Sequence, residues 1–378
     1  MVQQTRLEYL EAIRARYRGA GRLYKRRILD EFCQICGYHR KHAIRLLRAT
    51  QPGRQKKPGR PPKYGEEERK VLELIWLTAN RPCALRLKAA LPVWLPPYEA
   101  QCGRLPLLVK DKLLAISART LDRLLRPVRR RHGTRGRCGT RPGALLKYQI
   151  PIQTEHADIN QPGVMEADTV AHCGNSLDGN FVWSLTLTDV FSGWTQNRAV
   201  WNKGYEGVKQ AIADIEQELP FPLAGFHSDN GGEFLNHHLV RYFADRALPV
   251  AFTRSRPYHK NDTARVEQKN YTHVRLLLGY GRIEDPGLIP QINRLYQAWA
   301  LFNNFFSPSL KLVAKTKVGS RYRKRYDTPQ TPCQRLRHSP HVNEAIKLFL
   351  TEHACNLNPF ALKKQIDHYQ RLILNTVR

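Results

Sequence analysis

The chain has 378 residues, enough for two or three domains, and its 62 Lys and Arg against 32 Asp and Glu give a formal net charge of +30 at pH 7. A positive field of this strength attracts polyanions, so nucleic acid is the first partner that the composition predicts. No apolar run is long enough to span a bilayer, residues 1–4 lack a signal-peptide pattern, and eight scattered cysteines argue against a disulfide-built fold, so a cytoplasmic protein is expected.

Residues 1–52 have the pattern of a helix-turn-helix DNA-binding region. Thr5 and Glu8 have the spacing of a capping box that starts a first helix. An apolar face with Ile28 and Phe32 then runs into Gly37, after which a basic helix begins. An ordinary helical hairpin with a solvated basic face is the alternative. The predicted DNA contacts of the basic helix are Arg40, Lys41 and Arg45.

The same region contains four candidate zinc ligands, Cys33, Cys36, His39 and His42. Only two residues separate Cys36 from His39, which leaves little chain to wrap a tetrahedral site, and Cys33 fits the core face of its helix. No zinc is expected.

Residues 53–65 are rich in Pro and cations and form a basic linker. The linker resembles an AT-hook, in which Arg60 would enter a narrow minor groove, although a plain basic linker fits equally well. Residues 66–128 are predicted to form a second helical DNA-binding unit with a helix capped by Ser117, and residues 129–160 a basic extended arm. Their predicted DNA contacts are Arg119, Arg123, Arg129, Arg130 and Arg131.

Residues 161–305 change to an α/β pattern. Three strands at residues 164–171, 181–189 and 194–200 predict an antiparallel meander. A helix, a strand ending at Asp229, a further helix, a short strand at residues 250–253 and a long helix from about residue 262 follow. This order predicts a mixed five-stranded sheet flanked by helices.

Three carboxylates occupy informative places in this layout. Asp168 lies in the first strand, Asp229 ends the fourth, and Glu267 lies on the helix after the fifth. Hard oxygen ligands of this kind hold Mg²⁺, and two such metals stabilise the attacking and leaving oxygens of phosphoryl transfer. The layout therefore predicts a metal site at the carboxyl end of the sheet.

The runs at residues 166–169, 227–234 and 256–270 together resemble, in order and spacing, the integrase core of bacterial insertion-sequence transposases and retroviral integrases. The resemblance covers residues 164–278. It implies an RNase H-like fold, an Asp-Asp-Glu catalytic and metal-binding triad at Asp168, Asp229 and Glu267, and Mg²⁺ with Mn²⁺ as a substitute. Thr263-Ala264 stands where the family often has Asn-Gly, and Met165 where it often has Trp.

Basic residues around the last of these acids are further predicted DNA contacts, with a merely solvated loop as the alternative. These are Arg254, Arg256, His259, Lys260 and Lys269. Glu166 and Glu233 are candidates for accessory carboxylates, but roles in supporting a ligand or at the surface are more common for such residues. His172 is expected not to be a ligand. Residues 306–378 are predicted to form a basic, mainly helical tail.

The resemblance implies a transposase in which water and then a 3′-hydroxyl attack phosphorus, so that strands are cut and joined. It also implies double-stranded DNA as partner, both transposon ends and target, at least a dimer on DNA, and a bacterial, nucleoid-associated location without membrane contact. A structure-selective nuclease and a catalytically silent DNA-binding repressor remain as alternatives.

Overall fold

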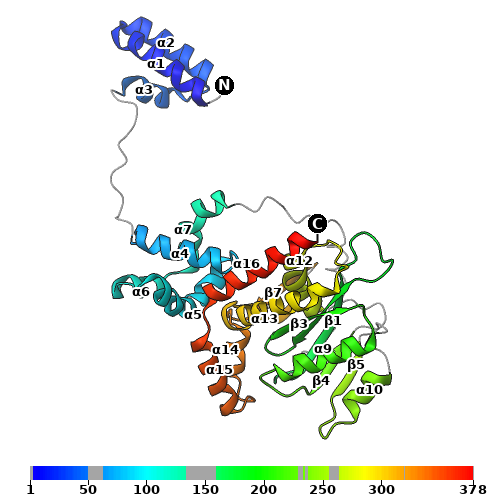
Figure 1. The fold of residues 1–378 in the computed structure, drawn as a ribbon. Coiled ribbons are helices and arrows are strands. Elements are labelled where there is room, and N and C mark those ends of the chain that lie inside the picture. Colours follow the sequence, from blue (N-terminus) through cyan, green and yellow to red (C-terminus); the bar gives the residue numbers. More distant parts are fainter. Residues whose placement is uncertain are drawn as a thin grey trace. The chain divides into compact units, whose positions relative to one another are not determined.

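A computed structural model of the chain describes residues 3–49, 63–132, 159–228, 233–234, 237–254, 264–318 and 320–377 (Figure 1). The chain divides into two compact units, Met1–Lys63 and Tyr64–Arg378, each of which is described by itself. Within the described ranges, no helix combines the length and the apolar composition needed to cross a bilayer.

The first unit is a bundle of three helices, α1 (Gln3–Gly19), α2 (Arg22–Cys36) and α3 (Arg40–Arg48). α1 begins before Thr5, so the predicted capping box is wrong: Thr5 lies inside the helix. Gly37 ends α2 with a φ of 68°, a left-handed conformation that suits glycine, and its N–H donates to Cys33 O (2.9 Å). The core is formed by Leu10, Ile13, Tyr17, Ile28, Leu29, Phe32, Cys36, Ala43 and Leu47.

Four helices open the second unit: α4 (Glu66–Thr78), α5 (Ala84–Cys102), α6 (Leu107–Leu114) and α7 (Ala118–Arg131). The predicted cap is confirmed, since Thr120 N donates to Ser117 Oγ (3.2 Å). The predicted extended arm is wrong for its first three residues, because α7 continues through Arg131. The buried Val128 and an ion pair between Arg129 and Asp122 (2.6 Å) hold this last turn in helical form.

A mixed five-stranded sheet follows, as the sequence predicts. Its order is β3-β2-β1-β4-β5, in which β2 runs antiparallel to β1 and β3, whereas β4 and β5 run parallel to β1. The strands are β1 (Val164–Ala171), β2 (Val182–Asp189), β3 (Thr195–Trp201), β4 (Gly225–Ser228) and β5 (Ala251–Arg254). The meander and the two parallel additions are therefore confirmed at nearly the expected residues.

Helices cover both faces of the sheet (Figure 1). Phe226 of β4 packs on Phe243 of α10 (4.8 Å between ring centroids), whereas Glu166 and Asp168 of β1 contact the helical segment that starts at Ala264, on the opposite face. The elements are α9 (Tyr205–Gln217), α10 (His237–Ala244), α11 (Ala264–Lys269), the π-helical turn η1 (Asn270–Arg275), α12 (Leu276–Leu278), the 3-10 turn η2 (Pro286–Leu288) and α13 (Ile289–Phe306).

The C-terminal part is helical, as predicted, but begins with a β-hairpin that the sequence analysis missed. Strands β6 (Leu312–Val318) and β7 (Arg321–Tyr326) pair antiparallel and precede α14 (Pro332–His338), α15 (Glu344–Asn356) and α16 (Pro359–Thr376).

One core joins the helices α4–α7 to the sheet and the C-terminal helices. Trp94 of α5 is fully buried among the rings of Phe302, Phe306 and Phe360, and its indole N–H donates to Phe306 O (2.9 Å). The boundary expected at residue 128 thus falls inside a compact unit.

Candidate active site and nucleic-acid interface

Asp168 lies at the carboxyl end of the parallel part of the sheet. The register pairs Ala167 of β1 with Ser228, the last residue of β4, so Asp168 is the next residue along β1. Its carboxylate is half-buried and accepts hydrogen bonds from Thr169 N to Oδ1 (2.8 Å) and from Asn270 Nδ2 to Oδ2 (2.6 Å). Asp229 follows Ser228 in the sequence and lies outside the described residues.

Glu267 lies in the first turn of α11 with an exposed side chain. The residue before it, Val266, donates its backbone N–H to Glu166 Oε2 (3.1 Å), and Asn270, one helical turn after it, binds Asp168. Strand β1 is therefore bonded to the helix on both sides of Glu267. These two bonds bring Asp168 and Glu267 onto adjoining elements.

Glu166 positions α11. Its side chain is fully buried and forms an ion pair with Arg265 Nη1 (2.9 Å). Burial raises the pKa of Glu166, while Arg265 and the backbone N–H of Val266 act in the opposite direction. Its oxygens bind the helix, so the structure gives Glu166 an anchoring role, which is of the supporting kind that the sequence analysis favoured over metal ligation.

Asn270, which the sequence analysis missed, begins the π-helical turn Asn270–Arg275. Single π turns inside α-helices occur frequently at functional sites. Its spacing could have identified it as a site residue, because a residue three positions after Glu267 lies on the same helix face.

The remaining candidates near the triad lie elsewhere. Glu233 accepts a hydrogen bond from Thr169 Oγ1 (2.9 Å) and forms an ion pair with Lys203 (3.7 Å). Thr169 is the residue after Asp168 on β1, so its side chain, and Glu233 with it, lies on the opposite face of the strand from Asp168. His172 is buried and bonded to Ser184 Oγ (2.7 Å), and burial, followed by the charge of Arg275, lowers its pKa to about 3. Among the described residues no cluster of three or more metal-binding side chains occurs, and Asp229 is not among them.

The donor set fits a hard divalent cation. Asp168 and Glu267 both offer carboxylate oxygens, the ligands that Mg²⁺ prefers. The Asn270 amide and the Thr169 N–H orient the Asp168 carboxylate in the way that ligating carboxylates are usually held.

Arginines line one face of α7. Four exposed arginines follow one another at intervals of four, three and four residues, which places them on a single face of the helix. Leu121 and Leu125 are buried on the opposite face, and the last turns border a shallow hollow. We call this set the arginine face of α7: Arg119, Arg123, Arg126 and Arg130.

Only some of the DNA contacts predicted on α7 belong to the arginine face. Arg119, Arg123 and Arg130 do, and they share this face with Arg126, which was not a predicted contact. Arg129 and Arg131 instead form ion pairs with Asp122 (2.6 Å) and Glu73 (3.5 Å).

In the first unit, the predicted contacts Arg40, Lys41 and Arg45 are all exposed on α3. Arg40 forms an ion pair with Asp30, and Arg45 bonds to His42 Nδ1 (2.9 Å). Arg254 ends β5, and nothing is described of its side chain. Four further predicted contacts lie outside the described residues: Arg60, Arg256, His259 and Lys260.

Lys269 has a different setting from the other predicted contacts. It is half-buried on α11, and burial, followed by the charges of Arg86 and Arg335, lowers its pKa to about 8. Lys269 therefore lies within electrostatic range of two other cations.

The chain is 42% identical over 344 residues to an uncharacterised protein, y4rM, of Sinorhizobium fredii. The match covers 88% of the chain and 95% of y4rM. The chain belongs to the same family as y4rM. No family model matches the chain.

Proposed function

We propose that the chain is a DNA transposase of the insertion-sequence type that cuts and joins DNA strands with Mg²⁺ held by Asp168, Asp229 and Glu267. The observation that carries the proposal is the pair of hydrogen bonds, Val266 N to Glu166 and Asn270 to Asp168, that fixes the helix of Glu267 on the strand of Asp168. An RNase H-like fold is part of the proposal. It is supported by a meander of three strands, followed by two parallel strands with helices between them.

The assignment of Asp229 rests on chain geometry. Ser228 pairs with the residue that precedes Asp168, and consecutive Cα atoms are about 3.8 Å apart. Ser228, the residue before Asp229 in the sequence, therefore lies at the same end of the sheet as Asp168. Ligands of open α/β sheets bind at this end of the strands.

The chemistry needs carboxylates that keep their positions while phosphorus is attacked. When bound, Mg²⁺ supplies charge neutralisation at the phosphate and a lowered pKa for the attacking hydroxyl. The protein orients Asp168 through Asn270 and Thr169, and it fixes the start of α11 through Glu166 and Arg265. No covalent intermediate on the protein is needed, because water and then the freed 3′-hydroxyl are the nucleophiles.

Two basic surfaces support duplex DNA as the substrate. The exposed basic residues of α3 follow a glycine turn, the arrangement proposed here as a helix-turn-helix, and α7 presents its arginine face. Synapsis of two transposon ends implies at least a dimer on DNA.

The test uses the full chain with duplex DNA taken from the regions flanking its coding sequence, in Mg²⁺ or Mn²⁺, with cleavage and strand transfer measured separately. Asp168→Asn and Glu267→Gln should each slow both steps by more than about 100-fold, because even residues that only orient metal ligands often matter 10–100-fold. Glu352→Gln, an exposed charge change on α15, is the control and should keep the activity.

Three results would contradict the proposal. Hydrolysis without joined products would identify a nuclease. DNA binding without cleavage in either metal would identify a repressor. Full activity of Glu267→Gln would remove Glu267 from the triad.

A further inference from the structure

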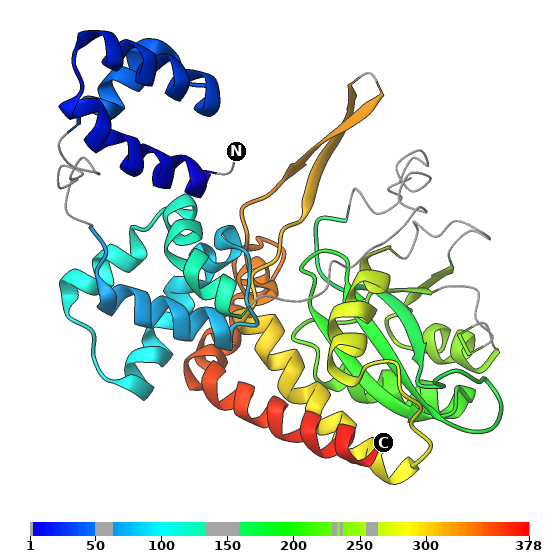
Figure 2. The same cartoon turned by 90° about the horizontal axis from the view of Figure 1, so that it is seen from above.

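The hairpin formed by β6 and β7 projects from the second unit as a two-stranded ribbon (Figure 2). Its sequence, Leu312–Tyr326, contains no Asp or Glu. Val313, Val318 and Tyr326 are at least half exposed, so the ribbon buries little of its own apolar surface. Six of its fifteen residues are cationic: Lys315, Lys317, Arg321, Arg323, Lys324 and Arg325.

The register distributes these cations over both faces of the ribbon. Thr316 pairs with Arg323, Lys317 with Tyr322, and directly paired residues share a face. Arg323 and Arg325 therefore lie on one face, and Lys317 on the other. A neutral protein surface or an acidic patch would contact one face, whereas a groove of duplex DNA carries phosphates along both walls and its major groove admits a two-stranded ribbon.

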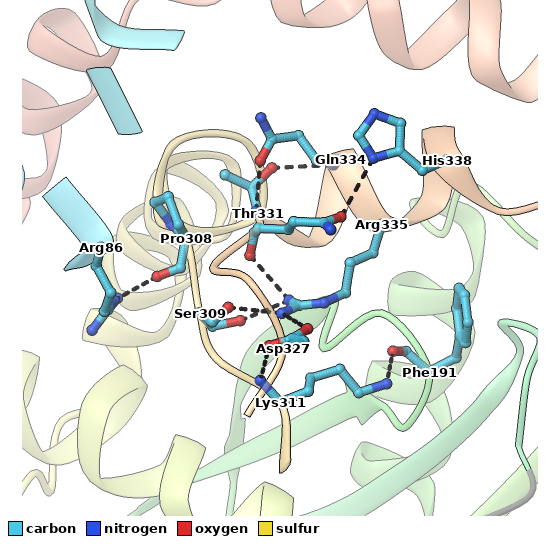
Figure 3. A network of polar contacts seen from close by, with 11 residues as sticks. Arg86, Phe191, Pro308, Ser309, Lys311, Asp327, Thr331, Gln334, Arg335 and His338 are labelled. Carbon is cyan, nitrogen blue, oxygen red and sulfur yellow. Dashed lines mark hydrogen bonds and ion pairs between the residues drawn. The ribbon is translucent and has the colours of Figure 1, made fainter. Parts of the chain in front are cut away.

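A buried guanidinium ties together the two chain segments that leave the hairpin (Figure 3). Arg335 donates to Ser309 Oγ (2.9 Å) and Ser309 O (2.7 Å) before β6, and to Asp327 Oδ2 (2.9 Å) and Gln330 O (3.0 Å) after β7. Ser309 and Gln330 also exchange backbone hydrogen bonds of 2.8 and 3.2 Å. We call these four residues the Arg335 cluster.

The base of the hairpin is also attached to the rest of the unit. Lys311 donates its backbone N–H to Asp327 Oδ1 (2.6 Å) and its ammonium group to Phe191 O, in the turn after β2 (Figure 3). Arg86 of α5 donates to Pro308 O. The hairpin thus has a rigid base on the sheet and on a helix.

This base lies near the candidate active site. Burial, followed by the charges of Arg335 and Arg265, lowers the pKa of Lys311 to about 8. The Phe191 carbonyl that accepts the Lys311 ammonium lies two residues after Asp189, and Asp189 pairs with Met165 of β1. Met165 lies three residues before Asp168, about 10 Å along the strand, so DNA held by the hairpin would pass close to Asp168 and to the α11 segment bonded to it.

We propose that the hairpin is a DNA-binding ribbon that lies in a groove of duplex DNA beside the cleavage site, and that the Arg335 cluster holds it at a fixed position on the catalytic unit. The identity of the cut DNA as its ligand rests on the proposed function. The binding itself rests on the acid-free ribbon, its two cationic faces and its rigid base.

The first experiment measures the affinity of the full chain for a short duplex as a function of salt. Arg323→Gln with Arg325→Gln should reduce the slope of log affinity against log salt by about 1.8, because each lost phosphate contact removes about 0.9. Lys88→Gln with Lys364→Gln, two exposed lysines elsewhere, changes the net charge equally and should leave the slope unchanged. Equal slopes for the hairpin variant and the parent would overturn the proposal.

The second experiment needs no substitution. Acetylation of Lys317, measured by mass spectrometry, should slow several-fold when the duplex is added and stay constant with polyglutamate. Protection by polyglutamate alone would identify an acidic protein as the partner, and protection by raising the protein concentration without DNA would identify a second copy of the chain. Either result would overturn the proposal.

The position on the catalytic unit is tested through Asp327→Asn, which weakens the cluster without removing a cation of the ribbon. The cleavage rate should fall, while DNA should still protect Lys317 from acetylation. An unchanged cleavage rate would contradict the claim that the Arg335 cluster holds the hairpin at a fixed position.

Glu267→Gln should bind DNA with the same salt slope as the unsubstituted protein. If the unsubstituted protein binds DNA through the hairpin but never cleaves it, the proposed function is contradicted, whereas DNA binding by the hairpin is still supported.

Discussion

Trp94 offers a test of how the second unit is built. The helices α4–α7 and the sheet are separated by a long basic segment in the sequence, yet the Trp94 ring lies among Phe302, Phe306 and Phe360. If this contact is structural, replacing Trp94 should destabilise the sheet as much as the helices.

The magnitude follows from the burial of the side chain. A fully buried indole removes roughly 200 Å² from water, which at about 25 cal/mol per Å² is worth about 5 kcal/mol, and measured Trp→Ala changes in cores cost about 3–5 kcal/mol. Trp94→Ala should therefore cost about 4 kcal/mol. Trp94→Phe keeps most ring contacts but loses the hydrogen bond to Phe306 O, so a cost of about 1–2 kcal/mol is expected.

Urea denaturation followed by tryptophan fluorescence is the assay, because all six tryptophans lie in the second unit and none in the first. Hydrogen exchange of the peptides that contain β2 and β3 adds a local readout of the sheet. Both should report the same loss of free energy of unfolding. Trp183→Phe, at a half-buried ring, is the matched control and should cost less than about 1 kcal/mol.

Two separate transitions, with β2 and β3 unaffected by Trp94→Ala, would refute the shared core. The helices α4–α7 would then be an independent domain, as their place in the sequence first indicated.

Three further predictions follow from other parts of the second unit. Arg123→Gln with Arg130→Gln should lower the salt slope of DNA binding by about 1.8, whereas Arg129→Gln with Arg131→Gln, whose side chains pair with Asp122 and Glu73, should lower it less; equal effects would contradict the division of α7. Glu166→Ala should reduce the cleavage rate without changing DNA affinity, since it releases the start of α11; an unchanged rate would mean that another contact holds the helix. The folded protein binds fewer protons than the unfolded chain between the lowered Lys311 pKa of about 8 and the ordinary value of about 10.4, so its free energy of unfolding should rise with pH across this window. Lys311→Met should lack that part of the rise, and parallel profiles from denaturation at several pH values would show that Lys311 is not responsible.

The sheet could be predicted from the sequence because its strands are apolar segments separated by glycine turns. Trp194 and its neighbours lie between such turns, and the register agrees with the expected meander. The local sequence pattern is sufficient to predict a strand when the strand buries its own apolar side chains.

The hairpin could not be predicted in this way. Residues such as Lys317 and Arg323 have low strand propensity or little apolar surface, and the strands are held by each other and by Arg335 at their base. The helical form of Arg129–Arg131 escaped for a similar reason, because charge density hides the apolar period that Val128 completes.

The sequence points to the acids of the candidate site but not to the residues that support them. Asp168 and Glu267 occur in recognisable runs, whereas the roles of Glu166 and Asn270 depend on a contact between segments about a hundred residues apart. Arg126 was missed because only the fold shows which side of α7 faces solvent.

The burial of Trp94 by distant segments also sets the order in which the protein can mature during synthesis. The first unit has all its core residues once α3 has emerged, but Trp94 has to wait for Phe360 of α16. At about 5–20 residues per second, the interval between the ends of α3 and α16 is roughly 15–65 s. During that time a nascent chain can hold a finished three-helix unit beside an incomplete second unit. The surface proposed to find DNA is thus available before the site proposed to cut it.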